Sequence, residues 1–429
     1  MYVKRISLQK ELKLIVVAII ACTIVIFSNS LYLHILSLLM VCVTAIILVK
    51  GELMHPYFWF SAFFGLYSCA YPLMLAMGIT AGIGYTKSTM LYQLLALITA
   101  LLIIGPDNPR EDNSLIQNNY NINLGVLNKI IYILLIALII CGALFVYQSG
   151  FSGKDDIYNS GNKFLIIIFR LPLILTMLYT LSVMISYSKY GKFPVKQTII
   201  TLIALALITL FSGERDFIFR FLMVNIFVLW FIRKVRIQHL IAMVPVLALL
   251  LPLSSTYKYY FLTGTASITN NNIIYSFLSG EFESAARNMQ KLINNSSYTM
   301  GVKGLKQIGL DLLSVFDSSI KSPTAWFNNT YYPTSKTQYG FTLVGEGYII
   351  AGTIGIVLVF VIVGLIIRLM YKKAYNNIYS LAAYIYFITI IIYSIRADLS
   401  TVYAALIKQV FMVLFILRIM EKLSKRKRD

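Results

Sequence analysis

The chain has 429 residues, of which 59% are hydrophobic and only 13% are charged. An average soluble protein carries roughly 25% charged residues, and the mean hydropathy of this chain is +0.77. A polar shell cannot cover this much apolar side chain, so composition excludes a soluble enzyme, a disordered chain and a secreted disulfide scaffold. What remains is an all-α polytopic integral membrane protein.

The cysteines and the N-terminus agree with this interpretation. Each of the four cysteines lies inside an apolar run and no Cys-x-x-Cys motif is present, so neither a disulfide framework nor a metal site is predicted. The basic N-terminus leads into an apolar run from Leu14, and no small-residue cleavage site follows Phe27. We therefore expect an uncleaved first membrane span rather than a signal peptide.

Taken in chain order, the apolar runs predict about twelve transmembrane helices, since a spanning helix needs about 20 mostly apolar residues. The expected helices cover residues 12–28, 31–49, 57–78, 89–105, 129–147, 164–187, 198–212, 217–232, 240–255, 349–371, 379–395 and 401–420. The runs 198–212 and 217–232 are short and are separated by a brief polar break. They also fit one kinked hairpin that dips partway into the bilayer.

The distribution of charge orients these helices. Both termini are rich in Lys and Arg, which the positive-inside rule places in the cytoplasm. The loops that then share that side carry basic residues at 189–196, 233–236 and 372–373, and the short opposite loops carry fewer. The formal net charge of +20 is therefore interpreted as a membrane orientation signal rather than as a nucleic-acid surface.

One connection is long and lies on the outer side. It covers residues 256–340, between an N-terminal transmembrane region (1–255, about nine helices) and a C-terminal one (341–429, about three helices). Within this loop, residues 273–292 and 302–316 have amphipathic character, and Trp326–Pro333 is rich in aromatic residues. A connection of this length in a compact protein is usually functional.

The polar break Ser212–Arg220 is the most informative short segment. Asp216 and Arg220 are four residues apart, so an ion pair on one helix face explains Arg220. Arg215 has no such helical partner. A guanidinium at the bilayer edge, beside a helix start, suits an anionic head group such as phosphate, and simple turn formation is the alternative.

Further charged residues fall on the same outer face. Glu283 and Arg287 are four apart in the long loop, where they form either a solvated stabilising pair or a substrate contact. Glu346 stands between two glycines where the chain returns to the membrane, as a favourable helix start or as a functional carboxylate. Arg396 and Asp398 lie in the last outer turn.

Histidine does not join this group, because His34, His55 and His239 fall elsewhere in the chain. A histidine base and a zinc site are therefore not expected. Several arginines and carboxylates on one face predict an anionic, lipid-linked substrate that is handled without a metal and without a cofactor.

These elements resemble a known family. They are a Gly-x-Arg break between two mid-chain spans, one large outer loop, and a Gly-Glu-x-Tyr-x-x-x-Gly-x-x-Gly return to the membrane. Here they correspond to Gly213–Arg215, Thr256–Gly340 and Gly345–Gly355. The chain is similar in these features to the bacterial O-antigen polymerases of the Wzy type. The resemblance covers most of the chain by topology and is sharp over residues 212–220 and 340–356.

The resemblance implies a membrane glycosyltransferase with a GT-C-like fold. Such an enzyme joins undecaprenyl-pyrophosphate-linked oligosaccharide repeat units at the periplasmic face of the bacterial inner membrane, with both termini in the cytoplasm. The growing chain moves from its lipid carrier to a new lipid-linked unit. The expected partners are the bilayer, a chain-length-regulating membrane protein and the repeat-unit flippase. No nucleic acid is expected as a partner.

The residues found above fit this chemistry. The departing pyrophosphate gathers negative charge that arginines stabilise, and the acceptor hydroxyl needs a general base. The candidates for pyrophosphate binding are Arg215, Arg287 and Arg396. The candidates for the base, in order of preference, are Glu346, Glu283 and Asp398. The aromatic stretch Trp326–Tyr332 either stacks on sugar rings or packs the loop.

Other activities remain open at this stage. A repeat-unit flippase or another transporter commonly shows internal repeats and charged helices near the midplane. Neither duplication nor a central polar cluster is found here, which favours an enzyme. An O-antigen ligase would share the expected fold and differ in its acceptor. A purely structural membrane partner would leave the outer arginines unexplained.

Overall fold

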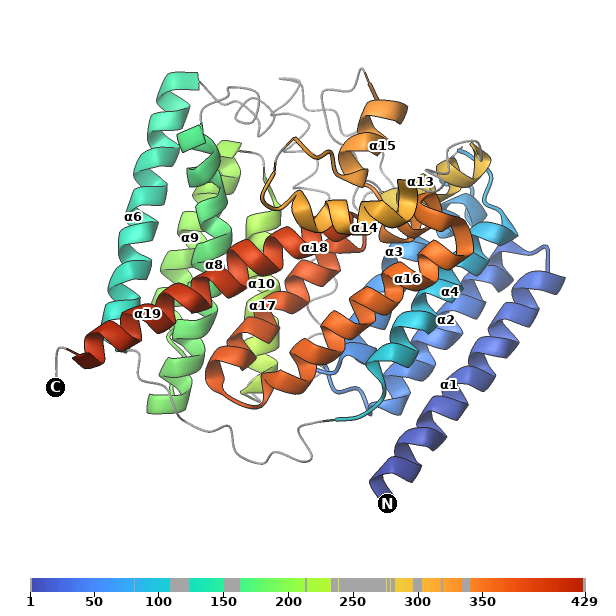
Figure 1. Cartoon of the computed structure of the whole chain (residues 1–429), viewed down its shortest axis with the longest axis horizontal. Helices are drawn as coiled ribbons and strands as arrows, with labels where there is room; N and C mark the ends of the chain where they lie inside the picture. Colours follow the sequence, from blue (N-terminus) through green and yellow to red (C-terminus); the bar gives the residue numbers. More distant parts are fainter. Residues whose placement is uncertain are drawn as a thin grey trace. The chain divides into compact units, whose positions relative to one another are not determined.

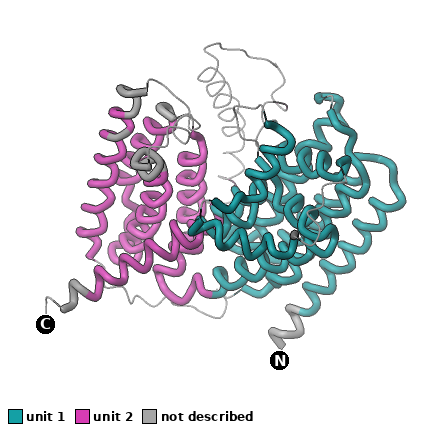
Figure 2. Tube along the Cα trace, turned by 45° about the horizontal axis from the view of Figure 1, so that its top comes forward, with its two compact units in different colours: residues 1–114, 278–372, 390–405 teal, residues 115–277, 373–389, 406–429 magenta. Residues whose placement is uncertain are grey.

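The computed structural model describes a helical protein (Figure 1). The described residues are 2–80, 82–108, 123–149, 163–212, 214–232, 282–295, 303–317, 319–333 and 340–426, together with Gln238, Tyr275 and Leu278. They group into two compact units, each assembled from segments distant in sequence (Figure 2). Unit 1 contains residues 1–114, 278–372 and 390–405, and unit 2 contains 115–277, 373–389 and 406–429.

The first four helices of unit 1 pack on one another. They are α1 (Tyr2–Phe27), α2 (Leu31–Leu48), α3 (Pro56–Ala76) and α4 (Lys87–Ile104). Their boundaries follow local chemistry, because Pro56 opens α3 after the His55 cap and the Thr86 hydroxyl caps α4. Inside the unit, the Ser68 hydroxyl donates to Gln93 Oε1 at 2.9 Å and thereby ties α3 to α4.

A second layer of unit 1 contains shorter helices. These are α13 (Glu283–Asn294), α14 (Lys303–Leu313), α15 (Pro323–Tyr331) and α18 (Leu399–Ala405). Helix α13 packs on α3 and α4, and the Gln290 side chain accepts hydrogen bonds from the Thr86 backbone and the Thr89 hydroxyl at the start of α4. Helix α14 lies beside α18 (Figure 1). The described parts of the long loop are therefore packed onto the helices of unit 1.

Helix α16 (Leu343–Ala374) contains a sharp break at Ala351 and Gly352. Gly352 has φ +59°, a backbone conformation that L side chains rarely adopt. Beyond the break, α16 is held against α4 by the Arg368 guanidinium, which donates to the Ile103 carbonyl at 3.1 Å. The short segment before the break, residues 343–350, therefore takes a direction of its own and carries Glu346.

Unit 2 contains α6 (Leu124–Ser149), α8 (Lys163–Tyr190), α9 (Val195–Ser212), α10 (Asp216–Phe231), a π-helical turn (Leu406–Phe411) and α19 (Met412–Arg426). Buried side-chain hydrogen bonds join these helices. The Tyr179 hydroxyl of α8 bonds to Asn225 Oδ1 of α10 at 2.6 Å and to the Thr198 hydroxyl of α9 at 2.7 Å. Helix α17 (Ile378–Ser394) contributes its first part to unit 2 and its last part to unit 1.

The expectation of an all-α membrane protein is confirmed. Among the described residues, seven helices are long and apolar enough to cross a membrane, and two shorter apolar helices, Val195–Thr209 and Ile378–Ser394, accompany them. The expected span 240–255 lies outside the described residues, and each of the others falls on a helix. The total of about twelve spans and the division at residues 255 and 340 stay predictions.

Candidate functional site

Three acidic side chains are fully buried in unit 1. Glu346 belongs to the short segment of α16, Asp311 to α14, and Asp398 precedes α18, and each has 0% of its surface exposed. A buried carboxylate is costly unless it is hydrogen-bonded or protonated. The partners of each group therefore decide what it can do.

Asp398 is saturated by hydrogen bonds. Its Oδ1 accepts from the Ser400 hydroxyl at 2.7 Å and from the Thr401 backbone and hydroxyl at 2.9 and 2.8 Å. Its Oδ2 accepts from the Thr324 N–H of α15 at 2.9 Å. Asp398 therefore caps the N-terminus of α18. Its bond to the Thr324 N–H also links the start of α15 to α18.

The carboxyl groups of Glu346 and Asp311 are close enough for each to influence the charge of the other. The second Glu346 oxygen, Oε2, accepts from the Leu399 N–H at 2.7 Å, and Asp311 Oδ1 accepts from Gln307 Nε2 at 2.8 Å. Glu346 Oε1 and Asp311 Oδ2 have no hydrogen-bond partner among the described residues. Two buried carboxyl groups this close repel each other when both are ionised, which favours a proton on one of them.

The electrostatics of Asp311 agree with a proton on one of the two acids. Burial raises the pKa of Asp311 to about 6, the neighbouring Glu346 and the hydrogen bond from Gln307 oppose this, and the nearby charge of Asp398 adds to it. A carboxyl with a pKa in this range changes its charge close to neutral pH. The pair can therefore accept or release a proton under ordinary conditions.

Glycines explain how Glu346 reaches this position. A Cβ on Gly347 would come within 2.5 Å of the Ile356 backbone, because the chain turns back on itself at the break in α16. A Cβ on Gly304 of α14 would overlap the Ile350 carbonyl. The small residues let α14 and the two parts of α16 approach closely enough for Asp311 and Glu346 to meet.

Helix α13 carries a cationic face next to aromatic rings. Arg287 Nη1 lies 3.0 Å from Glu283 Oε1, with 48% of the Arg287 side chain and 13% of the Glu283 side chain exposed. Burial raises the pKa of Glu283, and the Arg287 guanidinium opposes this increase. One turn further, Lys291 Nζ lies 3.9 Å from the ring centroid of Tyr332. Arg287 and Lys291 therefore both line the Glu283 face of α13.

The aromatic stretch of the long loop is mainly packing. Phe327 is fully buried and forms a cluster with Leu292, Phe341 and Ile349, against which Trp326, Tyr331, Tyr332 and Tyr348 pack. Phe327 lies 4.9 Å from Phe341, centroid to centroid. Of the two expectations for this stretch, loop packing is confirmed for Phe327.

Arg396 lies close to the acidic cluster along the chain. Its guanidinium stands over the Tyr393 ring at 4.8 Å. A Cβ on Gly340 would be 3.2 Å from both the Arg396 carbonyl and the Ser284 hydroxyl of α13. The turn that contains Arg396 and Asp398 is thus next to the start of α13.

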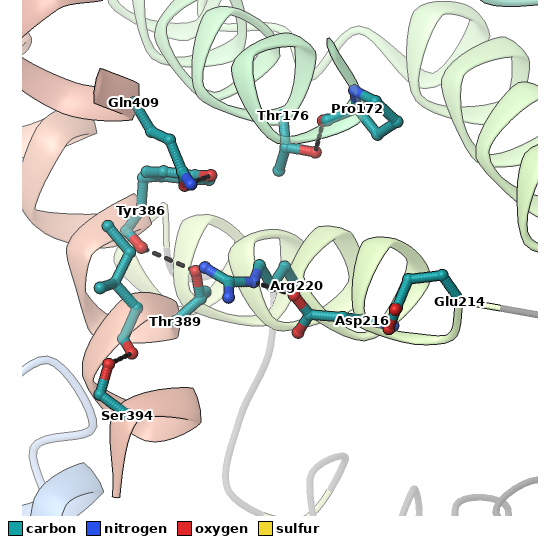
Figure 3. A network of polar contacts seen from close by, with 10 residues as sticks. Pro172, Thr176, Glu214, Asp216, Arg220, Tyr386, Thr389, Ser394 and Gln409 are labelled. Atoms are coloured by element: carbon teal, nitrogen blue, oxygen red, sulfur yellow. Dashed lines mark hydrogen bonds and ion pairs between the residues drawn. The ribbon is translucent and has the colours of Figure 1, made fainter. Parts of the chain in front are cut away.

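The residues of the mid-chain break lie in unit 2. Arg215 directly precedes α10, and Asp216 is the first residue of that helix. Arg220 Nε donates to Asp216 Oδ2 at 2.7 Å, which confirms the expected ion pair (Figure 3). The Tyr386 hydroxyl bonds to Arg220 and to Gln409 Oε1 at 2.7 Å. Arg220 is 4% exposed, so this is an interior network.

Comparison with known protein families gives a match for the C-terminal part of the chain. Residues 319–427, about a quarter of the chain, match the sequence profile of a family described as O-antigen polysaccharide polymerase Wzy. The match supports a Wzy-type O-antigen polymerase. It confirms the resemblance found in the sequence, and its segment includes Glu346, Arg396 and Asp398. No curated protein and no solved structure matches the chain.

The structure brings together part of the expected Wzy site. Glu346 and Asp398 lie in one cluster, since Glu346 bonds to Leu399, the neighbour of Asp398. Glu283, Arg287 and Arg396 belong to the same unit, and Arg215 belongs to the other. Within the described residues, no group of three or more His, Cys, Asp or Glu side chains is arranged to hold a metal ion.

Sequence reasoning missed Asp311. It lies in the amphipathic segment that was recognised at 302–316, on the face that also carries Gln307. A single acid among apolar neighbours on the buried face of a helix is a usable signal. The partner of that acid could not be read from the sequence, because α14 and α16 meet only through tertiary packing.

Proposed function

We propose that this chain polymerises lipid-linked oligosaccharide repeat units into an O-antigen or a related surface polysaccharide. The family match and the set of apolar helices support polymerisation in a membrane. The observation that carries the chemical part of the proposal is the buried pair of neighbouring acids, Glu346 and Asp311. A glycosyl transfer of this kind needs a group that takes one proton from the acceptor hydroxyl.

The proposed step is a displacement at the anomeric carbon. The acceptor oxygen forms the new C–O bond, the bond from that carbon to the lipid pyrophosphate breaks, and the pyrophosphate leaves with the electron pair. The proton of the acceptor hydroxyl passes to the Glu346–Asp311 pair. Asp398 acts as a positioning residue, because its hydrogen bonds hold α18, whose Leu399 N–H orients Glu346.

The leaving pyrophosphate requires cations. In unit 1, Arg287 and Lys291 on α13 and Arg396 beside the acidic cluster are the proposed partners. Arginine is suited to this role because its planar fork binds phosphate oxygens in pairs. Arg215 of unit 2 remains a proposed contact, on the basis of its place before a helix start. Charge stabilisation by these groups is consistent with transfer that is independent of a metal.

The acceptor hydroxyl can reach Glu346 and Asp311 only if part of the protein moves. Glu346 and Asp311 are both fully buried, so an acceptor hydroxyl reaches them only when a neighbouring element shifts. Helix α14 is the element that carries Asp311 and lies over Glu346. We therefore place the opening at α14.

The same proposal includes the fold of the chain and its orientation in the membrane. We infer about twelve spans in a GT-C-like arrangement, both termini in the cytoplasm, the acidic pair at the periplasmic face, and the bacterial inner membrane as the location. The positive-inside distribution of Lys and Arg supports this orientation. Undecaprenyl pyrophosphate is the proposed carrier, and a chain-length regulator and the flippase are the proposed protein partners.

The decisive experiment is a gel of surface polysaccharide from a strain that lacks this chain, with and without the chain restored. A band of single repeat units without the chain and a ladder with it would support a polymerase. Loss of all repeat units from the surface, with precursor retained inside, would instead identify a flippase. Finished chains that stay on the lipid carrier would identify a ligase.

The Arg215→Ala variant tests whether unit 2 takes part. We expect no ladder from this variant and a normal amount of the protein in the membrane, because a phosphate contact is lost without a change in the helices. A full-length ladder would remove Arg215 from the mechanism. The Arg215→Lys variant, which keeps the charge but loses the planar fork, should restore only part of the product.

A further inference from the structure

Helix α14 has two faces of opposite character. Its buried face contains Gly304, Gln307, Asp311 and, just beyond the helix, Val315. Its other face exposes large apolar side chains over an arc of about 100°. The exposed fractions are 55% for Leu305, 44% for Leu312, 54% for Leu313 and 75% for Phe316, which directly follows the helix.

The neighbour of α14 indicates what covers this apolar face. Gly304 lies directly against the backbone of Ile350 in α16, a helix long and apolar enough to span a membrane. Beyond the break in α16, the Ile354 side chain is 69% exposed. In a membrane-spanning helix such a residue faces acyl chains. Leu305, the first residue of the apolar face, directly follows Gly304, so this face begins beside the contact between α14 and α16.

The charge pattern of α14 agrees with a position at the membrane surface. Lys306 is exposed, and by helical geometry it lies between Leu313 and Leu310, whose side chain is 37% exposed. A lysine in that place reaches the head groups while its methylene stem covers apolar surface. A helix with Leu and Phe on one face and a polar opposite face is typical of interfacial helices.

We propose that α14 lies in the interface plane of the membrane, with Leu305, Leu312, Leu313 and Phe316 among the acyl chains of the leaflet that surrounds the break in α16. The opposite face of the helix then holds Gln307 and Asp311 against unit 1. The occupant of the apolar face is the bilayer itself, rather than a second copy of the chain or another protein.

This position has a consequence for substrate binding, which rests on the proposed function. An interfacial helix lies at the boundary of head groups and acyl chains. Asp311 and Glu346 are thereby held at the depth where the pyrophosphate of a lipid-linked substrate lies. The lipid carrier would present its reacting end to the acidic pair without leaving the bilayer, and a shift of α14 within the interface would open the pair.

Spin labelling tests the position of α14 directly. The full-length chain, with its four cysteines replaced by alanine, receives a nitroxide at Leu312→Cys and is placed in phosphatidylcholine–phosphatidylglycerol nanodiscs. Collisions with oxygen and with a water-soluble nickel chelate are measured. Ile354→Cys is the matched lipid-facing site, and Lys306→Cys is the matched site at the exposed lysine.

We expect the Leu312→Cys label to resemble the Ile354→Cys label, with oxygen accessibility several-fold above nickel accessibility, and the Lys306→Cys label to show the reverse. Dominant nickel accessibility at Leu312→Cys would place α14 in water and overturn the proposal. Low accessibility to both reagents would show that protein covers this face, with the same consequence. The result is independent of whether the chain polymerises sugars, which the polysaccharide gel decides separately.

Discussion

The two units of this protein bury charge in opposite ways. In unit 2, Asp216 and Arg220 form an ion pair at 2.7 Å inside the protein, and their charges compensate each other. In unit 1, Glu346 and Asp311 are two acids in contact, with no cation among the hydrogen-bond partners that hold them. The first arrangement needs no proton, and the second favours a proton on one of the two acids.

This difference separates a stabilising element from a chemical one. An ion pair whose charges compensate each other is tolerated in the interior, and removing only one of its two charges is costly. A pair of neighbouring acids adds no comparable cohesion, but it can take up a proton from a reacting group. The proposed base is therefore in unit 1, and the unit 2 network around Arg220 and Tyr386 serves the fold (Figure 3).

The largest expected effect comes from the Glu346→Gln variant. The amide can keep the contacts to Leu399 N–H and to Asp311, and it cannot act as a base. Polymerisation should fall by about 10²–10⁴-fold, the usual contribution of general acid–base catalysis, with normal protein in the membrane. The measurement is the polysaccharide ladder, with product quantified in membrane vesicles. A normal ladder from this variant would exclude Glu346 as the base.

Removal of only the acid of the unit 2 ion pair should chiefly affect stability. Asp216→Ala leaves Arg220 buried without its main counter-charge, and the cost is about 3–5 kcal/mol. The thermal unfolding of the purified protein in detergent measures this loss. Glu214→Ala, at the neighbouring acid, is the matched control and should change little.

A double variant sharpens the same comparison. Asp216→Ala combined with Arg220→Leu removes both charges and should be more stable than Asp216→Ala alone. If the double variant is instead the less stable of the two, the ion pair is not what holds Arg220 in the interior.

The acidic pair should make stability depend on pH. The folded-state pKa of Asp311 is raised to about 6, so the folded protein binds this proton more tightly than the unfolded chain. The stabilisation is present at low pH and is lost as pH rises through about 6, by about 1–3 kcal/mol. Asp311→Asn should remove this dependence, as measured by thermal unfolding at pH 5 and pH 7.5. An unchanged pH profile in the variant would mean that Asp311 does not carry the proton.

The smallest effect is expected at the α13 surface. The Arg287 side chain of the Glu283–Arg287 ion pair is about half exposed. Ion pairs between residues four apart on a helix contribute about 0.3–0.5 kcal/mol to stability. Glu283→Gln should therefore shift thermal unfolding only slightly and leave the ladder intact. A strong loss of polymer with normal stability would move the base from Glu346 to Glu283.

Much of the architecture could be predicted from local sequence patterns. Apolar runs predicted the helices, and the spacing of Asp216 and Arg220 predicted their ion pair, because both depend on the geometry of one helix. The Gly-x-Arg break, the large outer loop and the Gly-Glu-Gly-Tyr return to the membrane led to the family whose profile matches residues 319–427. The candidate site was predicted only in part, because Glu346 was recognised and Asp311 was not.

By itself, the sequence determined that this is a helical membrane protein and which charges stand out against its apolar background, since composition and helical periodicity are local properties. Only the tertiary structure decided what those charges do. Asp398 is saturated by donors from α15 and α18, and Glu346 meets Asp311. The meeting of Glu346 and Asp311 depends on the break in α16 and on glycines that admit a second helix. The bond from Thr324 to Asp398 depends on the packing of α15, and no local pattern encodes either contact.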